Sequence, residues 1–227
     1  MASDAADTAV NVLAIIATAC IFVSMIPGMY AVHKKRNTFG INFYPLAAMF
    51  GQSMGWVVYS WADGSFFPVG AVNCLGAVLG AIFSGVYILH EKEFRARYTA
   101  SFAATVVLII ALILYRFLSN QNDDDIAKVL GIFADIMAVI MFGSPLMLMG
   151  DVIKSKNSEI IAAPMAFSGL VNGALWTAYG IMQDDYYVLV ANAIGGLLCF
   201  VQVVLVLVFP RQADDKKADL LDNSSLA

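Results

Sequence analysis

The sequence has little charge. Charged residues make up 13% of its 227 residues and hydrophobic residues 60%, and the mean hydropathy is +0.77. These values lie outside the range of soluble globular domains. We therefore expect an integral membrane protein whose surroundings are the lipid bilayer. The net charge of -4 gives no reason to expect a nucleic-acid partner.

Motifs of catalysis and of cofactor binding are also missing. The sequence contains no HExxH, GxSxG, GxGxxG or Walker loop. The two histidines, His33 and His90, have no ligand partners nearby, and the three cysteines match neither a metal spacing nor a redox pair. The last apolar segment, 186–209, has no lysine that could hold retinal. We predict neither an enzyme nor a cofactor nor a metal site.

Long apolar segments are what the sequence has instead. A transmembrane helix needs about 20 apolar residues, and seven segments qualify: roughly 9–32, 42–62, 66–89, 100–118, 127–150, 160–181 and 186–209. Eleven of the thirteen Lys and Arg residues fall in alternate loops and in the C-terminal segment. By the positive-inside rule we expect the C-terminus in the cytosol and the N-terminus outside the cell or in a lumen.

The sequence repeats itself around the fourth apolar segment. Six identical residues recur at offsets of 118 to 120: Pro27 with Pro145, Pro45 with Pro164, Trp56 with Trp176, Tyr59 with Tyr179, Asn73 with Asn192, and Gly76 with Gly195. A single helix between the two units makes both enter the membrane from the same side. We therefore predict an all-α integral membrane fold of seven transmembrane helices, with two parallel three-helix bundles joined by a linker helix. The predicted parts are the first bundle (1–90), the linker helix with its loops (91–122), the second bundle (123–210) and a cytosolic tail (211–227).

Four prolines fall inside predicted helices at equivalent places in the two units. Pro27 and Pro145 lie in the first helix of each unit, and Pro45 and Pro164 lie in the second. Each is expected to remove one backbone hydrogen bond and to kink its helix. In lipid a freed carbonyl is tolerated only where protein or water satisfies it, so the matched set favours bending points along an interior path. The alternative is that transmembrane helices simply tolerate proline.

Two asparagines and two tryptophans predict a polar site between the bundles. Asn73 and Asn192 begin identical Asn-x-x-Gly turns, and an amide in hydrocarbon must be paired, so both should face inward. An amide offers donors and acceptors that suit a neutral polyol, whereas hydrogen bonding between helices is the alternative. Trp56 and Trp176 lie several residues inside their spans, where an indole can pack on a sugar ring or fill a core.

Three polar residues break the symmetry of the repeat. Gln52 and Asn172 each precede the tryptophan of their unit by four residues and share its helix face, which makes them further pocket candidates. Because the two differ, the predicted site is asymmetric. Asp135 is the only acid well inside a span, and such a residue is a functional hypothesis by default. We consider a proton site there, against an acid exposed to water near the outer end of its helix.

Together these residues resemble the SWEET family of sugar facilitators, and the likeness covers residues 9–209. It rests on the four prolines, the asparagine pair, Trp-x-x-Tyr at 56–59 and 176–179, and the step Tyr179-Gly180 followed by Asp185. The resemblance implies bidirectional uniport of a mono- or disaccharide of the glucose or sucrose class by alternating access. It also implies a homo-oligomer in the plasma membrane or in a vacuolar or other endomembrane.

The resemblance also implies roles for single residues. The asparagine pair would bind sugar hydroxyls and the tryptophan pair would form the pocket wall. The hinge and gating residues would be Pro27, Pro45, Pro145, Pro164, Tyr59, Tyr179, Gly180 and Asp185. The side chains of Gln52 and Asn172 would narrow the cavity toward a monosaccharide. Two alternatives stay open: a proton-coupled or amino-acid transporter of the PQ-loop group, and a seven-helix receptor, which leaves the duplication without a reason.

Overall fold

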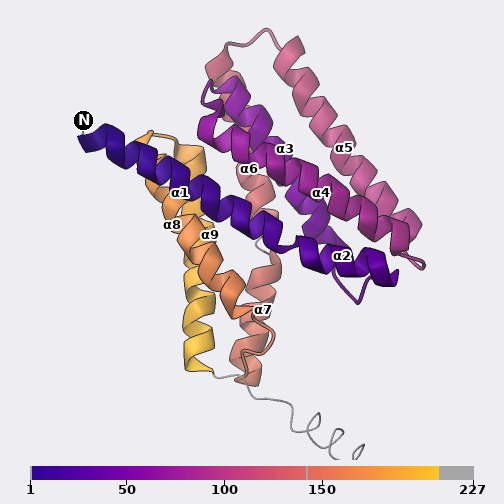
Figure 1. The fold of residues 1–227 in the computed structure, drawn as a ribbon. Coiled ribbons are helices and arrows are strands. Elements are labelled where there is room, and N and C mark those ends of the chain that lie inside the picture. The colour runs from indigo at the N-terminus through magenta and orange to yellow at the C-terminus, as the bar shows by residue number, and fades with distance from the viewer. Residues whose placement is uncertain (1, 142, 210–227) are drawn as a thin grey trace, which may run out of the picture.

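A computed structural model describes residues 2–141 and 143–209 of the chain, and the described part is helical without strands (Figure 1). The first bundle comprises α1 (Ala2–Ser24), α2 (Ile26–Lys35), α3 (Phe43–Ala62), a π-helical turn η1 (Phe66–Gly70) and α4 (Ala71–His90). The linker helix is α5 (Arg95–Leu118). The second bundle comprises α6 (Asp123–Met141), α7 (Gly143–Ser155), α8 (Ala163–Met182) and α9 (Tyr186–Val208).

Seven spans result, because α1 and α2 form one interrupted span and α6 and α7 form another. Four stretches are long and apolar enough to cross a membrane by length and composition alone: Ala5–Lys35, Phe66–His90, Arg95–Leu118 and Tyr186–Val208. The helices α3 and α8 have 20 residues each, which is enough to span a membrane, but each carries amide and hydroxyl side chains in its middle. The predicted arrangement of three helices, a linker and three helices is confirmed.

The two bundles contact each other through two helix pairs that are equivalent in the repeat. Within the bundles α3 packs on α4 and α8 packs on α9, and between them α1 packs on α8 and α3 packs on α6. Since α1 corresponds to α6 and α3 to α8, the two contacts between bundles are equivalent. The linker α5 packs on α3 and α4, on the side away from α8 and α9 (Figure 1).

Three of the four prolines lie in the first turn of a helix. Pro27 is the second residue of α2, after a break at Met25, and Pro164 is the second residue of α8. Pro45 is the third residue of α3, and Pro145 is the third residue of α7, with a side chain outside the described ones. A first-turn N–H has no partner inside its helix, so proline is tolerated there. For Pro45 and Pro164 the expectation of a lost interior hydrogen bond is therefore wrong. Pro27 lies at the interruption of the Ala5–Lys35 span, as expected. For Pro145 the expectation stays a prediction, because residue 142, between α6 and α7, lies outside the described residues.

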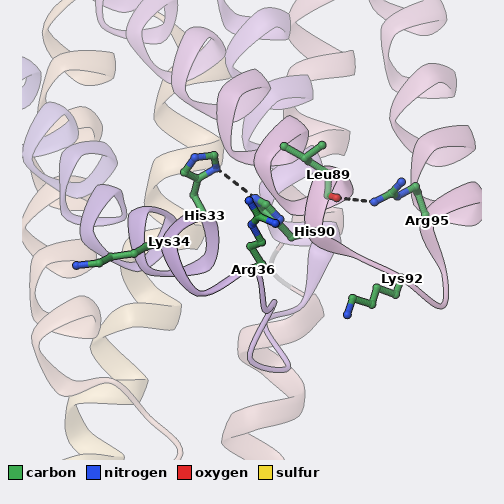
Figure 2. Close-up of a pocket in the computed structure, with 7 residues that line it drawn as sticks. All are labelled: His33, Lys34, Arg36, Leu89, His90, Lys92 and Arg95. Carbon is green, nitrogen blue, oxygen red and sulfur yellow. Dashed lines mark hydrogen bonds between the residues drawn. The ribbon is translucent and has the colours of Figure 1, made fainter.

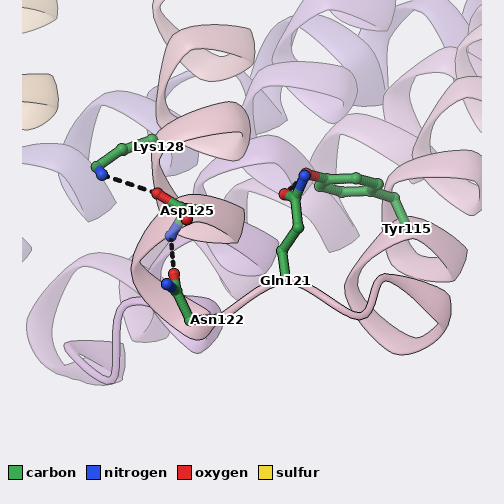
Figure 3. Close-up of polar contacts among 5 residues, drawn as sticks. All are labelled: Tyr115, Gln121, Asn122, Asp125 and Lys128. Atoms are coloured by element: carbon green, nitrogen blue, oxygen red, sulfur yellow. Dashed lines mark hydrogen bonds and ion pairs between the residues drawn. The ribbon is translucent and has the colours of Figure 1, made fainter.

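The turn between α5 and α6 ties the linker to the second bundle (Figure 3). The Tyr115 hydroxyl donates to Oε1 of Gln121 at 2.6 Å, and Oδ1 of Asn122 accepts from the N–H of Asp125 at 2.8 Å at the start of α6. Lys128 Nζ lies 2.8 Å from Oδ1 of Asp125. These short-range contacts fix where α6 enters the membrane, which in turn fixes the face that α6 presents to α3.

Candidate functional site

A cavity of about 380 Å³ lies between the two bundles. All six predicted pocket residues line it: Asn73, Asn192, Trp56, Trp176, Gln52 and Asn172. They come from α3 and α4 in the first bundle and from α8 and α9 in the second. Its volume is within the range of small-molecule sites. The structure thus brings together residues that the sequence separates by more than a hundred positions.

The two asparagines are held in the same way. Asn73 Nδ2 donates to the Val69 carbonyl at 2.9 Å, and Asn192 Nδ2 donates to the Val188 carbonyl at 2.9 Å. A carbonyl only accepts, so the contacting atom of each amide must be the nitrogen. Each asparagine therefore keeps its Oδ1 and one amide hydrogen for a molecule in the cavity. The matched backbone bonds fix the directions of both.

The two tryptophans share a ring geometry but differ in their hydrogen bonds. Each indole packs edge-on against the tyrosine three residues later, with ring centroids 5.5 Å apart for Trp56 and Tyr59 and 5.4 Å for Trp176 and Tyr179. All four residues are buried. Trp176 Nε1 donates to Thr18 Oγ1 at 2.7 Å, whereas no hydrogen bond of the Trp56 indole occurs among the described residues.

Thr18 is a site residue that sequence reasoning missed. Its hydroxyl lies 2.7 Å from Oδ1 of Asn172 and 2.9 Å from the Ala14 carbonyl, and it accepts from Trp176. Thr18 therefore joins α1 to α8 at the cavity wall. The only signal in the sequence is a hydroxyl within an apolar run. That signal is weak, because threonine in a helix commonly bonds the carbonyl one turn earlier.

The cavity is closed at one end and open at the other. At the closed end Trp56 and Trp176 are each 5% exposed and Val188 is 1% exposed, whereas Met165 at the other end is 45% exposed. The open end lies beside the turns after α2 and α7. The last turns of α2 and α7 and the residues directly after them include Lys34, Lys35, Arg36, Lys154 and Lys156, and we call this side of the molecule the basic face.

A hydrogen bond between the bundles lies beyond the closed end. Tyr59 Oη donates to Oδ1 of Asp185 at 2.9 Å, and the same oxygen accepts from the Val188 N–H at 3.0 Å at the start of α9. Oδ2 of Asp185 is buried without a partner. Burial raises the pKa of Asp185, because desolvation outweighs the hydrogen bonds from Val188 and Tyr59 that favour the charged form.

The other predicted gating residues fall into two groups. Pro45 lines the cavity, whereas Pro27 and Pro164 are exposed and do not, so an interior path lined by all the prolines is not what the structure shows. Gly180 is required for close packing, since a Cβ there would lie 2.6 Å from the Leu189 backbone nitrogen. The hydroxyl of Tyr179 makes no hydrogen bond within the described residues, unlike that of Tyr59.

Asp135 lies on α6, outside the cavity lining. Its side chain is partly buried, and Oδ1 has no hydrogen-bond partner in the described structure. The structure therefore does not bring Asp135 into the cavity with the asparagines, and the proton site stays a prediction.

Known proteins are similar to this chain in sequence and in fold. The model of a family described as "Sugar efflux transporter for intercellular exchange" matches residues 8–95 and 128–214. The bidirectional sugar transporter SWEET8 of Arabidopsis thaliana is 26% identical over 203 residues, which cover 87% of this chain and 85% of that protein. The sugar transporter SWEET1 of Danio rerio is 24% identical, over 80% of this chain and 82% of that protein. A solved structure of a eukaryotic SWEET transporter superposes with a TM-score of 0.83 at 20% identity, covering 92% of this chain and 99% of the other.

Proposed function

The chain belongs to the family of sugar efflux transporters for intercellular exchange, and from this premise we propose that it carries a small neutral sugar across a membrane in both directions, as a uniporter. It is a multi-pass membrane protein, in agreement with the prediction that its surroundings are the lipid bilayer. The observation that carries the proposal is the cavity between the bundles, in which each bundle places one indole and two amides.

The chemistry of the cavity fits a neutral polyol. Asn73 and Asn192 offer acceptor and donor groups whose directions are already fixed by their bonds to Val69 and Val188. No Lys, Arg, Asp or Glu is among the described residues that line the cavity, so a charged solute would have no counter-ion there. A sugar that lacks the right hydroxyl would leave an amide unpaired, at a cost of about 1–3 kcal/mol. Selectivity then follows from the hydroxyl pattern.

Alternating access is the mechanism that the geometry supports. The cavity opens toward the basic face, which the positive-inside rule assigns to the cytosol, so this conformation faces inward. On the other side Tyr59 and Asp185 hold the bundles together at 2.9 Å. We infer that opening the outer end breaks this bond while the two bundles rock. Pro27, Pro45 and Pro164 lie in the first turns of helices that would move, which supports a hinge role for them and, through the repeat, for Pro145.

Uptake into proteoliposomes tests the proposal. Radiolabelled glucose and sucrose are followed in vesicles that contain the purified chain, and each asparagine is replaced by alanine in turn. We expect saturable sugar uptake by the wild type and at least a tenfold fall in Asn73→Ala and Asn192→Ala, equivalent to about 1.4 kcal/mol or more. Asn120→Ala, which removes the same group from the exposed turn after α5, is the matched control and should transport normally. Full flux through well-folded Asn192→Ala protein would reject the assignment.

A second arm of the same assay addresses proton coupling. The buried, unpartnered oxygen of Asp135 is the observation that favours it. Uptake is compared with and without a pH gradient, in the wild type and in Asp135→Asn. A uniporter shows the same initial rate in both conditions, whereas a proton-coupled carrier accelerates with the gradient and loses that response in the variant. An amino-acid panel in the same vesicles separates the alternative PQ-loop substrates. The homo-oligomeric state and the particular membrane stay predictions.

A further inference from the structure

A second hollow lies on the basic face of the first bundle, away from the sugar cavity. It has a volume of about 690 Å³ and lies between the end of α2 and the turn from α4 to α5 (Figure 2). Apart from Leu89, the side chains that line it are basic: His33, Lys34, Arg36, His90, Lys92 and Arg95. We call this hollow the basic groove.

The cations of the basic groove have no acidic partners. Within the described residues no ion pair involves Lys34, Arg36, Lys92 or Arg95. The neighbouring carboxylate, Glu91, is already engaged, because its Oε1 accepts the backbone N–H groups of residues 92, 93 and 94 at 3.0–3.2 Å. These bonds hold the pKa of Glu91 below its usual range. Glu93 is exposed and also forms no ion pair within the described residues, so the four Lys and Arg residues of the groove outnumber the two carboxylates of this turn.

Three of the side chains are held by hydrogen bonds. The Arg95 guanidinium donates to the carbonyl oxygens of Ile88, Leu89 and Glu91, and so caps the end of α4. Nε2 of His90 lies 3.2 Å from Nδ1 of His33, with the rings edge-on at 5.2 Å (Figure 2). The second nitrogen of each ring makes no hydrogen bond in the described structure. The groove thus offers pre-positioned donors beside exposed lysines.

The second bundle has other residues at the equivalent corner, although this corner lies on the same basic face. Arg36 and Lys156 occupy the same turn, with φ angles of 51° and 57°, and their N–H groups bond the carbonyls of Val32 and Val152. In this register His33 corresponds to Ile153. His90 corresponds to Phe209, at the offset of 119 that relates the two asparagines.

In the second bundle the aromatic ring of Phe209 contacts the cation of this turn, Lys156. The Lys156 ammonium lies 4.7 Å from the centroid of the Phe209 ring. The first bundle thus has two histidines, His33 and His90, beside cations that form no ion pair among the described residues. At the corresponding positions the second bundle has Ile153 and Phe209, and Phe209 contacts Lys156. The same backbone can therefore complete this corner with apolar residues. The first bundle does not.

We propose that the basic groove binds the phosphate group of an anionic lipid headgroup from the leaflet on the basic face. Arg and Lys donors match phosphate oxygens, and basic pockets at helix ends on this side of a membrane suit lipid phosphates. The surroundings also fit a lipid, since Leu89 in the groove is 57% exposed and Tyr30 on α2 is 64% exposed. Both lie within reach of acyl chains at the membrane boundary. The inference is independent of what the central cavity carries.

The chain's two histidines make the test direct, because both line the groove. Protein with ¹⁵N-labelled histidine is placed in nanodiscs of phosphatidylcholine, alone or with a phosphatidylinositol phosphate, and the ring signals are recorded by NMR. We expect saturable shifts of the His33 and His90 signals with the phosphorylated lipid. The double variant Arg36→Ala, Lys92→Ala should weaken this binding roughly thirtyfold. The matched control Lys154→Ala, Lys156→Ala removes two charges from the same face of the second bundle and should leave the affinity unchanged.

Three results would overturn the proposal. The first is the absence of a shift with the phosphorylated lipid. The second is an equal loss in the two double variants, which would mean that only the total charge of the face matters. The third is the same saturation with soluble inositol phosphate at equal bulk concentration in phosphatidylcholine nanodiscs, which would assign the groove to a soluble anion. Circular dichroism of both double variants verifies that the helices are intact.

Discussion

In the first bundle the indole N–H of Trp56 has no hydrogen-bond partner among the described residues, whereas in the second bundle that of Trp176 donates to Thr18 at 2.7 Å. The asparagines one helix away make identical bonds in both bundles. The repeat therefore keeps the polar contacts that point at the cavity and varies the contacts behind them. A duplicated unit can in this way build a site with two similar walls and different selectivity on each side.

The hydrogen bond that closes the outer end of the cavity also lacks a counterpart in the described part of the repeat. Tyr59 of the first bundle bonds Asp185 of the second. In the repeat the counterpart of Tyr59 is Tyr179, and the counterpart of Asp185 is Ser65, which also precedes its helix. Tyr179 and Ser65 do not bond, and the Ser65 hydroxyl is buried without a partner. One bond between bundles thus holds this end where symmetry would allow two.

The largest expected effect comes from giving the second bundle the residue of the first. Gly173 corresponds to Ser53, and a Cβ at Gly173 would lie 2.6 Å from Cα of Gly196. Because the obstacle is backbone, Gly173→Ser must separate α8 from α9, which we expect to cost about 1–3 kcal/mol or more. The midpoint of thermal unfolding in detergent should fall by roughly 3 °C per kcal/mol.

Gly85→Ala is the control for this substitution. Gly85 lies in α4 and has nothing within 4 Å of an added Cβ, so this variant should unfold at the same temperature or slightly higher. An unchanged midpoint for Gly173→Ser would mean that the two bundles pack alike, and the comparison would lose its structural basis.

A smaller effect is expected from removing the hydroxyl that distinguishes the two tryptophans. Thr18→Val keeps the shape of the side chain but leaves the Trp176 N–H buried without a partner, at a cost of about 1–3 kcal/mol. Thr177→Val removes a hydroxyl that bonds only the Gly173 carbonyl of its own helix, and it should cost less. Thermal unfolding and sugar affinity are measured for both. Equal behaviour of the two variants would remove Thr18 from the site.

The smallest effect concerns the outer closure. Tyr59→Phe removes the bond to Asp185, which we expect to shift the population toward the outward-open state by about 1–2 kcal/mol, roughly tenfold. Cys199 lines the cavity and reports this opening, with Cys20 and Cys74 replaced by serine. An impermeant maleimide added from the side of Asp185 should label Cys199 faster in Tyr59→Phe and at the wild-type rate in Tyr179→Phe. Faster labelling in both variants would contradict a one-sided closure.

The repeat made the bundles and the pocket predictable from the sequence. Identical residues at a constant offset must occupy equivalent places, and two equivalent asparagines or tryptophans can share a site only near the axis that relates the bundles. That reasoning brought Asn73, Asn192, Trp56 and Trp176 to one cavity. Gln52 and Asn172 followed from helical spacing alone.

The features that differ between the bundles could not be found in this way. Thr18 bonds a residue 158 positions later, and no pattern within α1 identifies its partner. His33 and His90 meet across 57 positions, because both are at helix ends whose distance depends on tertiary packing. Pro45 and Pro164 were misjudged because hydropathy locates the start of a helix only to within a few residues, so the sequence does not show that both lie in a first turn.

The most direct test of the account is sugar binding measured through the site's own indoles. The chain has three tryptophans, and Trp61→Phe leaves Trp56 and Trp176, both of which line the cavity. In that background we predict a saturable change of tryptophan fluorescence with sugar, and a loss of affinity when either Asn73 or Asn192 becomes alanine. Wild-type affinity in either asparagine variant would contradict a single site to which both bundles contribute.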